Sequence, residues 1–429
     1  MTGYKSAARR GPGAGRDVMA AVLLLAAGAA IGWLSFRSAM VRTLPPSAWV
    51  IAQIAPYDPE VVLARATDLL VRRHGLLDAA TLDAVRRAAI AAPLDARPFL
   101  ILGHQQLLEG APDEAVATLE AGEKRDPRQR LSHLLLLDRY LRAARYGDAA
   151  MQFSVLSRLL GAAQAPIAAA MAQMAMAPDT RDAVRRTLWS DPILERAVLK
   201  ALAAADTAPA AIFALASPAA ALEGRTVESW GPVLIARLVR RGRYAAARSA
   251  WQRIYAVPPA QAAALVANAG FDKIATAPPF DWTLAAGSLG AADLRGGSLA
   301  VEYYGRDTGV LASQLLVLGP GRYRFAISVD PGNMATAAKL FWALACGAGT
   351  FDPDKPALMT VAVIAAARPR RIAADIVVPD GCPVQMLTLR GEAGAFPVPL
   401  SVTLRDLDLR AASPPASPAA SPATAPAAS

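Results

Sequence analysis

The spacing of hydrophobic and polar positions changes twice along the chain. Val18 to Phe36 carries no charge over 19 residues, enough for a helix to cross a bilayer. From Asp58 to Ala269 apolar residues recur at helical spacing, and from Gly270 to Arg410 they alternate with polar ones. The pattern therefore predicts a multidomain α plus β protein: an apolar N-terminal helix, a helical region and an antiparallel β-sandwich.

The uncharged run predicts a single transmembrane anchor. Trp33 lies near its end, where an indole favours the membrane interface. More basic residues precede the run than follow it: Lys5, Arg9, Arg10 and Arg16, against Arg37 and Arg42. We therefore expect residues 1–17 in the cytoplasm, residues 18–36 in a bacterial inner membrane, and the C-terminal bulk in the periplasm.

The alternative is a signal peptide cut after Ala29, because Ala27 and Ala29 satisfy the small-residue rule for cleavage. The apolar run continues past that point through Phe36, which favours an uncleaved anchor. Either interpretation places the body of the protein outside the cytoplasm.

The helical domain is expected over 58–269, after a linker at 37–57. Asp58 before Pro59 indicates an N-cap with proline at the first helical position. Helix-ending signals recur, as at Gly110 and at Asp126-Pro127. The runs are short and closely spaced, which is typical of antiparallel helix pairs.

One stretch resembles the tetratricopeptide repeat. The residues that carry the resemblance are Phe99, Leu102, Gly103, Ala115, Leu119 and Pro127. Gln106 stands where the family has tyrosine. The small residues would let two helices approach closely, the large ones would fill the gap, and the proline would end the second helix.

Two weaker copies follow. The first has Tyr140, Ala149 and Phe153 in register, and the second, offset from an integral repeat number, has Ala247, Trp251 and Pro259. The alternative is a plain helical bundle with coincidental spacing. The resemblance implies a solenoid that binds a protein partner, with these positions in its core, and it implies no catalysis.

The C-terminal region predicts short strands. Gly321 to Val329 places alternate apolar residues on one face, and similar alternation marks 299–303, 340–346 and 400–404. The order of features resembles the jelly rolls of carbohydrate-binding modules and galactose-binding-like domains. The stretches that carry this resemblance are Gly270-Phe271, Pro279 to Trp282, the strand pair Gln314–Leu318 and Tyr323–Val329 around a Pro-Gly turn, and Val402 to Leu409.

Such modules bind glycans through exposed aromatic side chains, so the resemblance implies a possible glycan ligand. Trp282, Tyr303 and Trp342 fall on the apolar faces and are expected in the core. Tyr304 points the opposite way from Tyr303 and is the better surface candidate. No sugar site can be assigned from the residues.

The chain has two cysteines, Cys346 and Cys382, both in the sandwich region. Since export would place them where disulfides form, we predict a bridge between them. The alternative is two unpaired buried thiols.

Composition adds little chemistry. The net charge is +10, but the arginines alternate with apolar helical positions and accompany no nucleic-acid-binding module, so no nucleic-acid partner is expected. The three histidines, His74, His104 and His133, lack nearby ligands, and Asp352 with Asp354 is more typical of a turn than of a calcium site. No catalytic motif is present, so we expect no catalytic, cofactor-binding or metal-binding residues.

The last part, 411–429, contains Ala, Ser, Pro and one Thr, and we expect a flexible tail. The whole pattern favours a non-enzymatic, anchored periplasmic scaffold whose helical arm recruits a protein, and it suggests a role in cell-envelope or exopolysaccharide assembly. The alternatives are a glycan-binding protein with the arm as spacer, and an enzyme of unfamiliar type.

Overall fold

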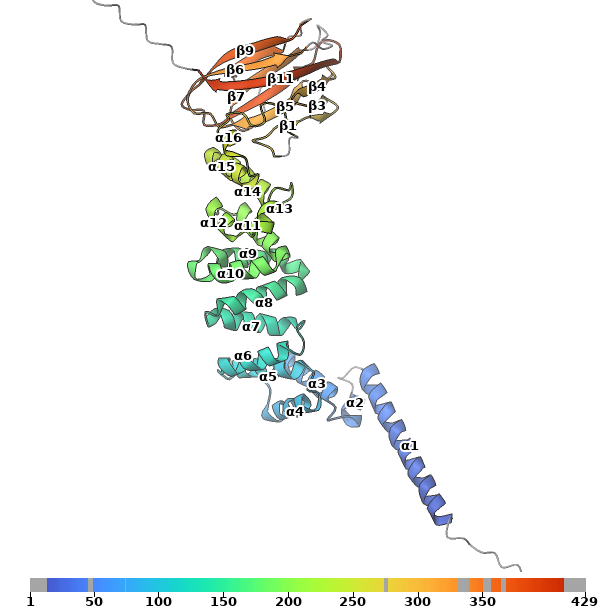
Figure 1. Cartoon of the computed structure of the whole chain (residues 1–429). Coiled ribbons are helices and arrows are strands. Elements are labelled where there is room, and N and C mark those ends of the chain that lie inside the picture. Colours follow the sequence, from blue (N-terminus) through green and yellow to red (C-terminus); the bar gives the residue numbers. More distant parts are fainter. Residues whose placement is uncertain are drawn as a thin grey trace, which may run out of the picture. The chain divides into compact units, whose positions relative to one another are not determined.

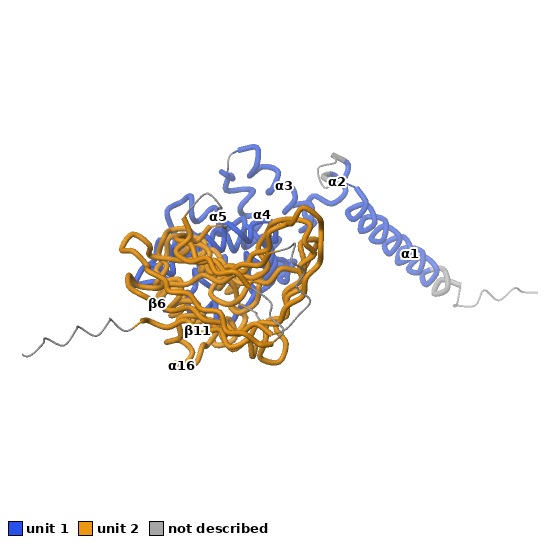
Figure 2. The backbone as a smooth tube through the Cα atoms, turned by 90° about the horizontal axis from the view of Figure 1, so that it is seen from above, with its two compact units in different colours: residues 1–194 blue, residues 195–429 orange. Residues whose placement is uncertain are grey.

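The computed structural model describes residues 14–44, 49–73, 75–273, 277–330, 339–349, 356–363 and 368–412. His74, the Asp352–Asp354 pair and most of the predicted tails lie outside these residues. The chain divides into two compact units, 1–194 and 195–429 (Figure 2). The boundary falls within one helix of the helical region.

Helices fill the first part of the chain (Figure 1). They are α1 (Ala14–Thr43), α2 (Trp49–Ile54), α3 (Pro59–Arg72), α4 (Ala79–Ala91), α5 (Arg97–Leu108), α6 (Pro112–Glu123), α7 (Arg130–Arg142), α8 (Tyr146–Leu159), α9 (Gln164–Met176), α10 (Pro178–Ser190), α11 (Pro192–Ala204), α12 (Pro209–Leu215), α13 (Pro218–Glu223), α14 (Trp230–Arg240), α15 (Tyr244–Ile254) and α16 (Pro259–Ala262). A 3-10 turn, Gly161–Ala163, precedes α9.

Strands follow from Thr283 onward. They are β1 (Thr283–Leu284), β2 (Ala286–Gly287), β3 (Gly290–Leu294), β4 (Leu299–Tyr303), β5 (Gly309–Leu316), β6 (Gly321–Val329), β7 (Lys339–Cys346), β8 (Met359–Val363), β9 (Arg370–Val378), β10 (Gln385–Glu392) and β11 (Leu400–Ala411). The predicted fold class, a helical region followed by an antiparallel sandwich, is confirmed.

Helix α1 carries the expected apolar segment. From Met19 to Thr43 it is long and apolar enough to cross a membrane, and its most apolar stretch is not buried against the protein. Leu24 and Leu25 are each 74% exposed. Such a helix near an N-terminus is either a signal sequence or an anchor.

The helices of unit one pair as the spacing predicted. Asp58 caps α3, accepting a hydrogen bond from the Glu60 amide at 3.1 Å. At the α5–α6 crossing, a side chain added to Gly103 would lie 2.7 Å from Leu119. The two helices therefore pack so closely that only glycine fits at this position.

Most of the predicted repeat positions are buried, two are half-buried and two are exposed. Ala115, Leu119, Tyr140, Ala149, Phe153, Ala247 and Trp251 are buried, and Phe99 and Leu102 are half-buried. Pro127 and Pro259 are exposed, so their expected place in the core is wrong. Pro127 lies in the turn after α6, and Pro259 is the first residue of the short helix α16, where a proline needs no burial.

Overpacking tests this helix register. Ala115 and Ala247 are 0% exposed, so Ala115→Leu and Ala247→Leu are each expected to lower the free energy of unfolding by about 1–3 kcal/mol. Ala117→Leu is the control, because Ala117 on α6 is exposed. Urea unfolding that tolerates all three substitutions equally would contradict the register.

The sandwich has two antiparallel sheets. One has the order β1-β5-β10-β7-β8 and the other β2-β3-β4-β11-β6-β9. Two strands, β5 and β6, flank the Pro-Gly turn as expected, but they do not pair with each other, because they belong to different sheets. The turn at Gly319 to Gly321 instead carries the chain from one sheet to the other.

The core between the sheets contains the large aromatic residues. Trp282 and Trp342 lie 5.9 Å apart between ring centroids, and Phe325 lies 5.7 Å from Trp342. Trp282, Trp342 and Tyr303 are 1% exposed or less, as their face of the strand predicted. Tyr304, by contrast, is 38% exposed.

The last helices pack against the sandwich within unit two. Trp251 on α15 donates its indole hydrogen to the Ala277 carbonyl at 2.8 Å, and its ring lies 5.9 Å from the Phe280 ring at a tilt of 56°. The buried Gln314 amide exchanges two hydrogen bonds with the Ala267 backbone, at 2.9 and 3.0 Å. Val266, just after the helices, is part of the sandwich core.

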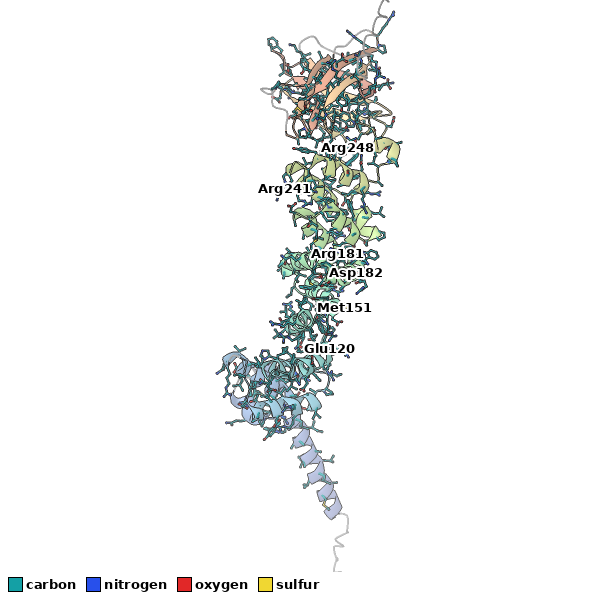
Figure 3. The ribbon with its side chains drawn as sticks, turned by 90° about the vertical axis from the view of Figure 1, so that its left-hand side faces the viewer. Glu120, Met151, Arg181, Asp182, Arg241 and Arg248 are labelled. Carbon is teal, nitrogen blue, oxygen red and sulfur yellow. A yellow bond between two sulfur atoms is a disulfide. The ribbon has the colours of Figure 1, made fainter. Side chains whose placement is uncertain are left out.

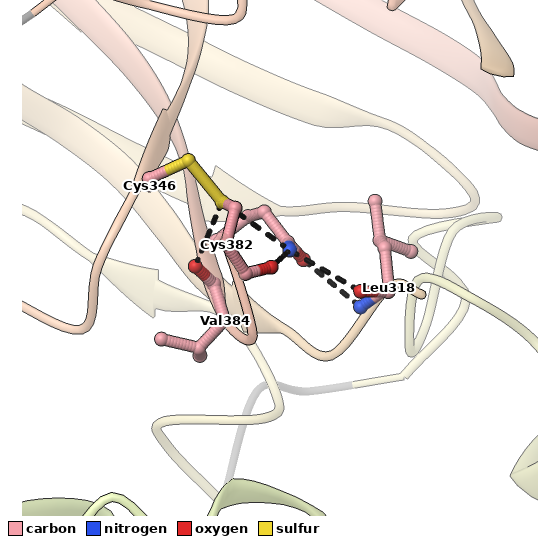
Figure 4. Close-up of a disulfide and its surroundings, with 5 residues drawn as sticks. Leu318, Cys346, Cys382 and Val384 are labelled. Atoms are coloured by element: carbon pink, nitrogen blue, oxygen red, sulfur yellow. Dashed lines mark hydrogen bonds between the residues drawn. A yellow bond between two sulfur atoms is a disulfide. The ribbon is translucent and has the colours of Figure 1, made fainter. Parts of the chain in front are cut away.

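The structure joins Cys346, the last residue of β7, to Cys382 (Figure 4). Their Cα atoms are 5.5 Å apart, and Cys382 belongs to the sandwich core. The neighbouring Gln385 side chain donates to the Cys382 carbonyl at 2.6 Å and accepts from the Leu318 amide at 2.9 Å. An apolar N-terminal helix together with a disulfide indicates a location outside the cytoplasm.

Several arginines bind backbone carbonyls that helices leave unpaired at their C-terminal ends. The buried Arg237 side chain donates to the carbonyls of Ala205 and Thr207, the latter at 2.7 Å, just beyond α11. Arg225 does the same for Ile254, the last residue of α15, at 2.9 Å. Part of the basic excess therefore serves the fold of the helical region.

Candidate binding surfaces

Two adjoining hollows lie on the face formed by α6, α7 and α8. Their volumes are about 270 and 490 Å³, and they share Glu120, Tyr140 and Arg145. Glu120 comes from α6 and Tyr140 from α7, while Arg145 directly precedes α8. Figure 3 shows Glu120 and Met151 on the side of unit one that faces the viewer.

The shared residues form one bonded cluster. The Tyr140 hydroxyl donates to Glu120 at 2.8 Å, and the Arg145 guanidinium lies 4.4 Å above the Tyr140 ring. Arg145 also donates to Asp148 at 2.7 Å and to Glu120 at 3.4 Å. Burial, followed by the hydrogen bond to the Glu120 carboxylate, raises the pKa of Tyr140, so its hydroxyl stays protonated and keeps donating.

A second set of hydrogen bonds holds the side chains beside the larger hollow in place. His133, which is 1% exposed, contacts the Gln152 side chain at 2.6 Å and the Pro127 carbonyl at 2.9 Å. Gln152 in turn donates to Glu123 at 3.4 Å. His133 is thus held by neighbouring helices, and the described residues hold no group of three or more potential metal ligands.

Met151 gives the larger hollow an apolar border. Its side chain is 62% exposed although it sits among charged residues. A flexible, polarisable thioether at an open hollow is typical of surfaces that bind other proteins. The arrangement offers carboxylates, a cation and an apolar contact within one small area.

The sandwich carries a second candidate surface, on the outer face of the five-stranded sheet. Strand register aligns a row of small side chains across all five strands: Thr283, Ser313, Thr388, Ala343 and Thr360. Thr388 and Ala343 are 1% exposed, whereas the two ends of the row are exposed. In the adjacent row Phe341 lies opposite Arg390, and both are half-buried.

The outer face of the six-stranded sheet is different in kind. Ion pairs cross it, including Arg324 with Asp375 at 2.9 Å and Arg371 with Asp408 at 3.8 Å. Among the strand residues described, its outward positions carry no aromatic side chain. It has the character of an ordinary solvated surface.

No protein-family model matches the chain, and no curated protein matches it. Solved structures do match, over about a third of the chain. The likeness is one of fold. The N-terminal cellulose-binding domain of β-1,4-glucanase C from Cellulomonas fimi is 14% identical, with a TM-score of 0.25, over 35% of this chain and 99% of its own.

Two further structures are similar over the same share of the chain. TmCBM61 in complex with β-1,4-galactotriose is 14% identical, with a TM-score of 0.25, over 35% of this chain and 99% of its own. A cyclase from Fischerella sp. TAU is 14% identical, with a TM-score of 0.24, over 35% and 96%. The sandwich thus resembles carbohydrate-binding modules in fold, which by itself specifies no ligand.

Sequence reasoning placed few of the residues that border these surfaces. Of the repeat positions, only Tyr140 and Pro127 line the hollows among the described residues, and Ala247, Trp251 and Pro259 belong to the second compact unit. Glu120, Arg145 and Met151 were missed. The one signal that could have found Met151 is its apolar side chain on the polar side of α8, which the repeat pattern does not require.

Proposed function

We propose that this chain is a non-enzymatic scaffold of the cell envelope, held in the inner membrane by Val18–Phe36, that recruits a protein partner to the α6–α8 face. The observation that carries the proposal is the pair of hollows around Tyr140, bordered by the exposed Met151. The resemblance of the helix pairs to tetratricopeptide repeats supports it, because such repeats bind protein segments.

The chemistry of the face narrows the partner to a protein segment with an apolar residue beside a basic one. Met151 would contact the apolar residue. Glu120 and Glu123 retain partly exposed side chains, 34% and 27%, that can accept hydrogen bonds from a lysine or arginine.

Met151→Glu is expected to weaken partner recovery from detergent-solubilised membranes about tenfold or more, because a charge would enter the apolar contact. The fold should be unaffected, since Met151 is 62% exposed. Met176→Glu is the matched control: Met176 is 39% exposed at the end of α9 and borders neither hollow. Equal recovery with both variants would refute the α6–α8 face as the binding site.

A second candidate function is glycan binding by the outer face of the five-stranded sheet, which would suit cell-envelope or exopolysaccharide assembly. The observation that favours it is the set of accessible hydroxyl side chains in the row beside Phe341 and Arg390, namely the exposed Thr283 and Thr360 and the half-buried Ser313. Hydroxyl groups both donate and accept hydrogen bonds, as sugar recognition needs, and the Phe341 ring offers an apolar face to a pyranose.

Phe341→Ala is expected to abolish retardation of the full chain in native gels containing a bound polysaccharide. Arg324→Ala, on the outer face of the other sheet, should leave retardation unchanged. Retardation by none of a panel of β-glucans, galactans and the cell's own exopolysaccharide would rule this candidate out.

A further inference from the structure

A hollow of about 720 Å³ lies where the end of α1 meets the start of α3. Its walls combine apolar side chains, two cations and two anions: Leu34, Val41, Arg37, Arg42, Asp58 and Glu60. Neither the proposed partner site nor the glycan candidate uses any of these residues.

This corner of the molecule is a packed structure. Ile51, Ala55 and Val61, from α2, its C-terminal end and α3, are 0% exposed. Val41 and Leu44, from the end of α1 and just beyond it, pack against them. The hollow therefore has a fixed floor, and the last turns of α1 are held against the first turn of α3.

The position of the hollow relative to the bilayer is set by the end of the membrane-spanning segment, so this inference rests on the proposed membrane location. Leu34 belongs to the uncharged run, and Arg37 is the first charged residue after it. The hollow consequently begins in the hydrocarbon region and opens among the lipid headgroups.

The acidic side chains of the hollow are already occupied. Asp58 caps α3 through the Glu60 amide at 3.1 Å. Glu60 accepts two hydrogen bonds from Arg97, at 2.7 and 2.5 Å. Hydrogen bonding from the Arg97 side chain lowers the pKa of Glu60. Both carboxylates therefore already accept hydrogen bonds from within the protein.

The cations are not occupied in the same way. Arg37 approaches Asp58 at 3.8 Å, too far for a hydrogen bond, and its Nε atom is buried without a partner among the described residues. Arg42 is exposed in the last turn of α1. Two guanidinium groups with donors to spare, next to apolar walls, match a phosphodiester joined to acyl chains.

We propose that this hollow binds one anionic phospholipid of the bilayer that α1 spans. The phosphodiester accepts hydrogen bonds from Arg37 and Arg42, and the first acyl carbons lie against Leu34 and Val41. The bound lipid completes the wall between the anchor and the helical arm.

Native mass spectrometry of the full chain in detergent tests this proposal, with phosphatidylglycerol, phosphatidylethanolamine and inorganic phosphate as probes. We expect one retained phosphatidylglycerol per chain and at least tenfold weaker retention in the Arg37→Gln, Arg42→Gln double variant. The matched control is Arg86→Gln with Arg87→Gln on α4, which removes the same charge away from the hollow and should retain the lipid.

Equal loss of lipid in the control variant, or unchanged retention in the test variant, would overturn the site. Competition by millimolar inorganic phosphate alone would show an anion site without lipid specificity, which also contradicts the proposal. Sedimentation of the same preparations with membranes separates the two hypotheses. A chain that sediments but retains no lipid refutes the lipid site, whereas a soluble chain beginning near Ala30 refutes the anchor itself.

Discussion

Replacing Cys346 and Cys382 together by alanine is expected to lower the free energy of unfolding of the sandwich by about 3–4 kcal/mol. The two residues are 36 positions apart in sequence, and the bridge restricts that loop in the unfolded chain. It also ties the end of β7 to the segment that leads into β10, which are neighbouring inner strands of the five-stranded sheet. Urea unfolding of the full chain, followed by near-ultraviolet circular dichroism of the Trp282–Trp342 pair, measures the effect.

Chemical reduction of the unsubstituted protein is the control for the alanine variant. Both should shift the urea midpoint by the same amount, because both remove the same restriction of the unfolded chain. Free thiols that react with an alkylating reagent before reduction, in protein purified from the envelope, would show that the bridge does not form in the cell. They would also weaken the inference of export.

The largest effect we expect is one of topology. A reporter that functions only in the periplasm, fused after Ser413, should be fully active, and a strictly cytoplasmic reporter at the same junction should be inactive. The reason is the excess of basic residues before the uncharged run, which holds that end in the cytoplasm. Removing residues 18–36 should abolish both export and sedimentation with membranes.

The reverse result of the two reporters would refute export. An active periplasmic reporter together with a soluble chain beginning near Ala30 would keep export and exclude the anchor. The two outcomes are distinguishable, because reporter activity gives the side of the membrane and fractionation shows whether the chain is attached to it.

The elements could be predicted from sequence where local chemistry decides them. Asp58-Pro59 fixes the start of α3, and strict alternation from Gly321 to Val329 gives β6 with both bounds correct. The pairing of strands was not predictable in the same way. A Pro-Gly turn is compatible with a hairpin or with a crossing between sheets, and only the packing of β5 and β6 in the whole sandwich selects the second.

The candidate surfaces were harder to predict than the elements. A repeat pattern reports the positions that pack, so it led to Ala115 and Leu119 in the core and gave no information on Glu120 or Met151 beside the hollow. The row Thr283–Ser313–Thr388–Ala343–Thr360 joins residues from five strands, and it exists only once their register is known.

The clamp between Gln314 and Ala267 has a consequence for how such a protein evolves. The buried amide satisfies a backbone group of the segment that follows the helices, and Val266 from that segment fills the sandwich core. A sandwich transferred to another chain from Gly270 onward would leave that amide without its partner and that core with a gap. The sandwich is therefore not an independent domain from Gly270 onward, and recombination could transfer it intact only together with Val266 and Ala267.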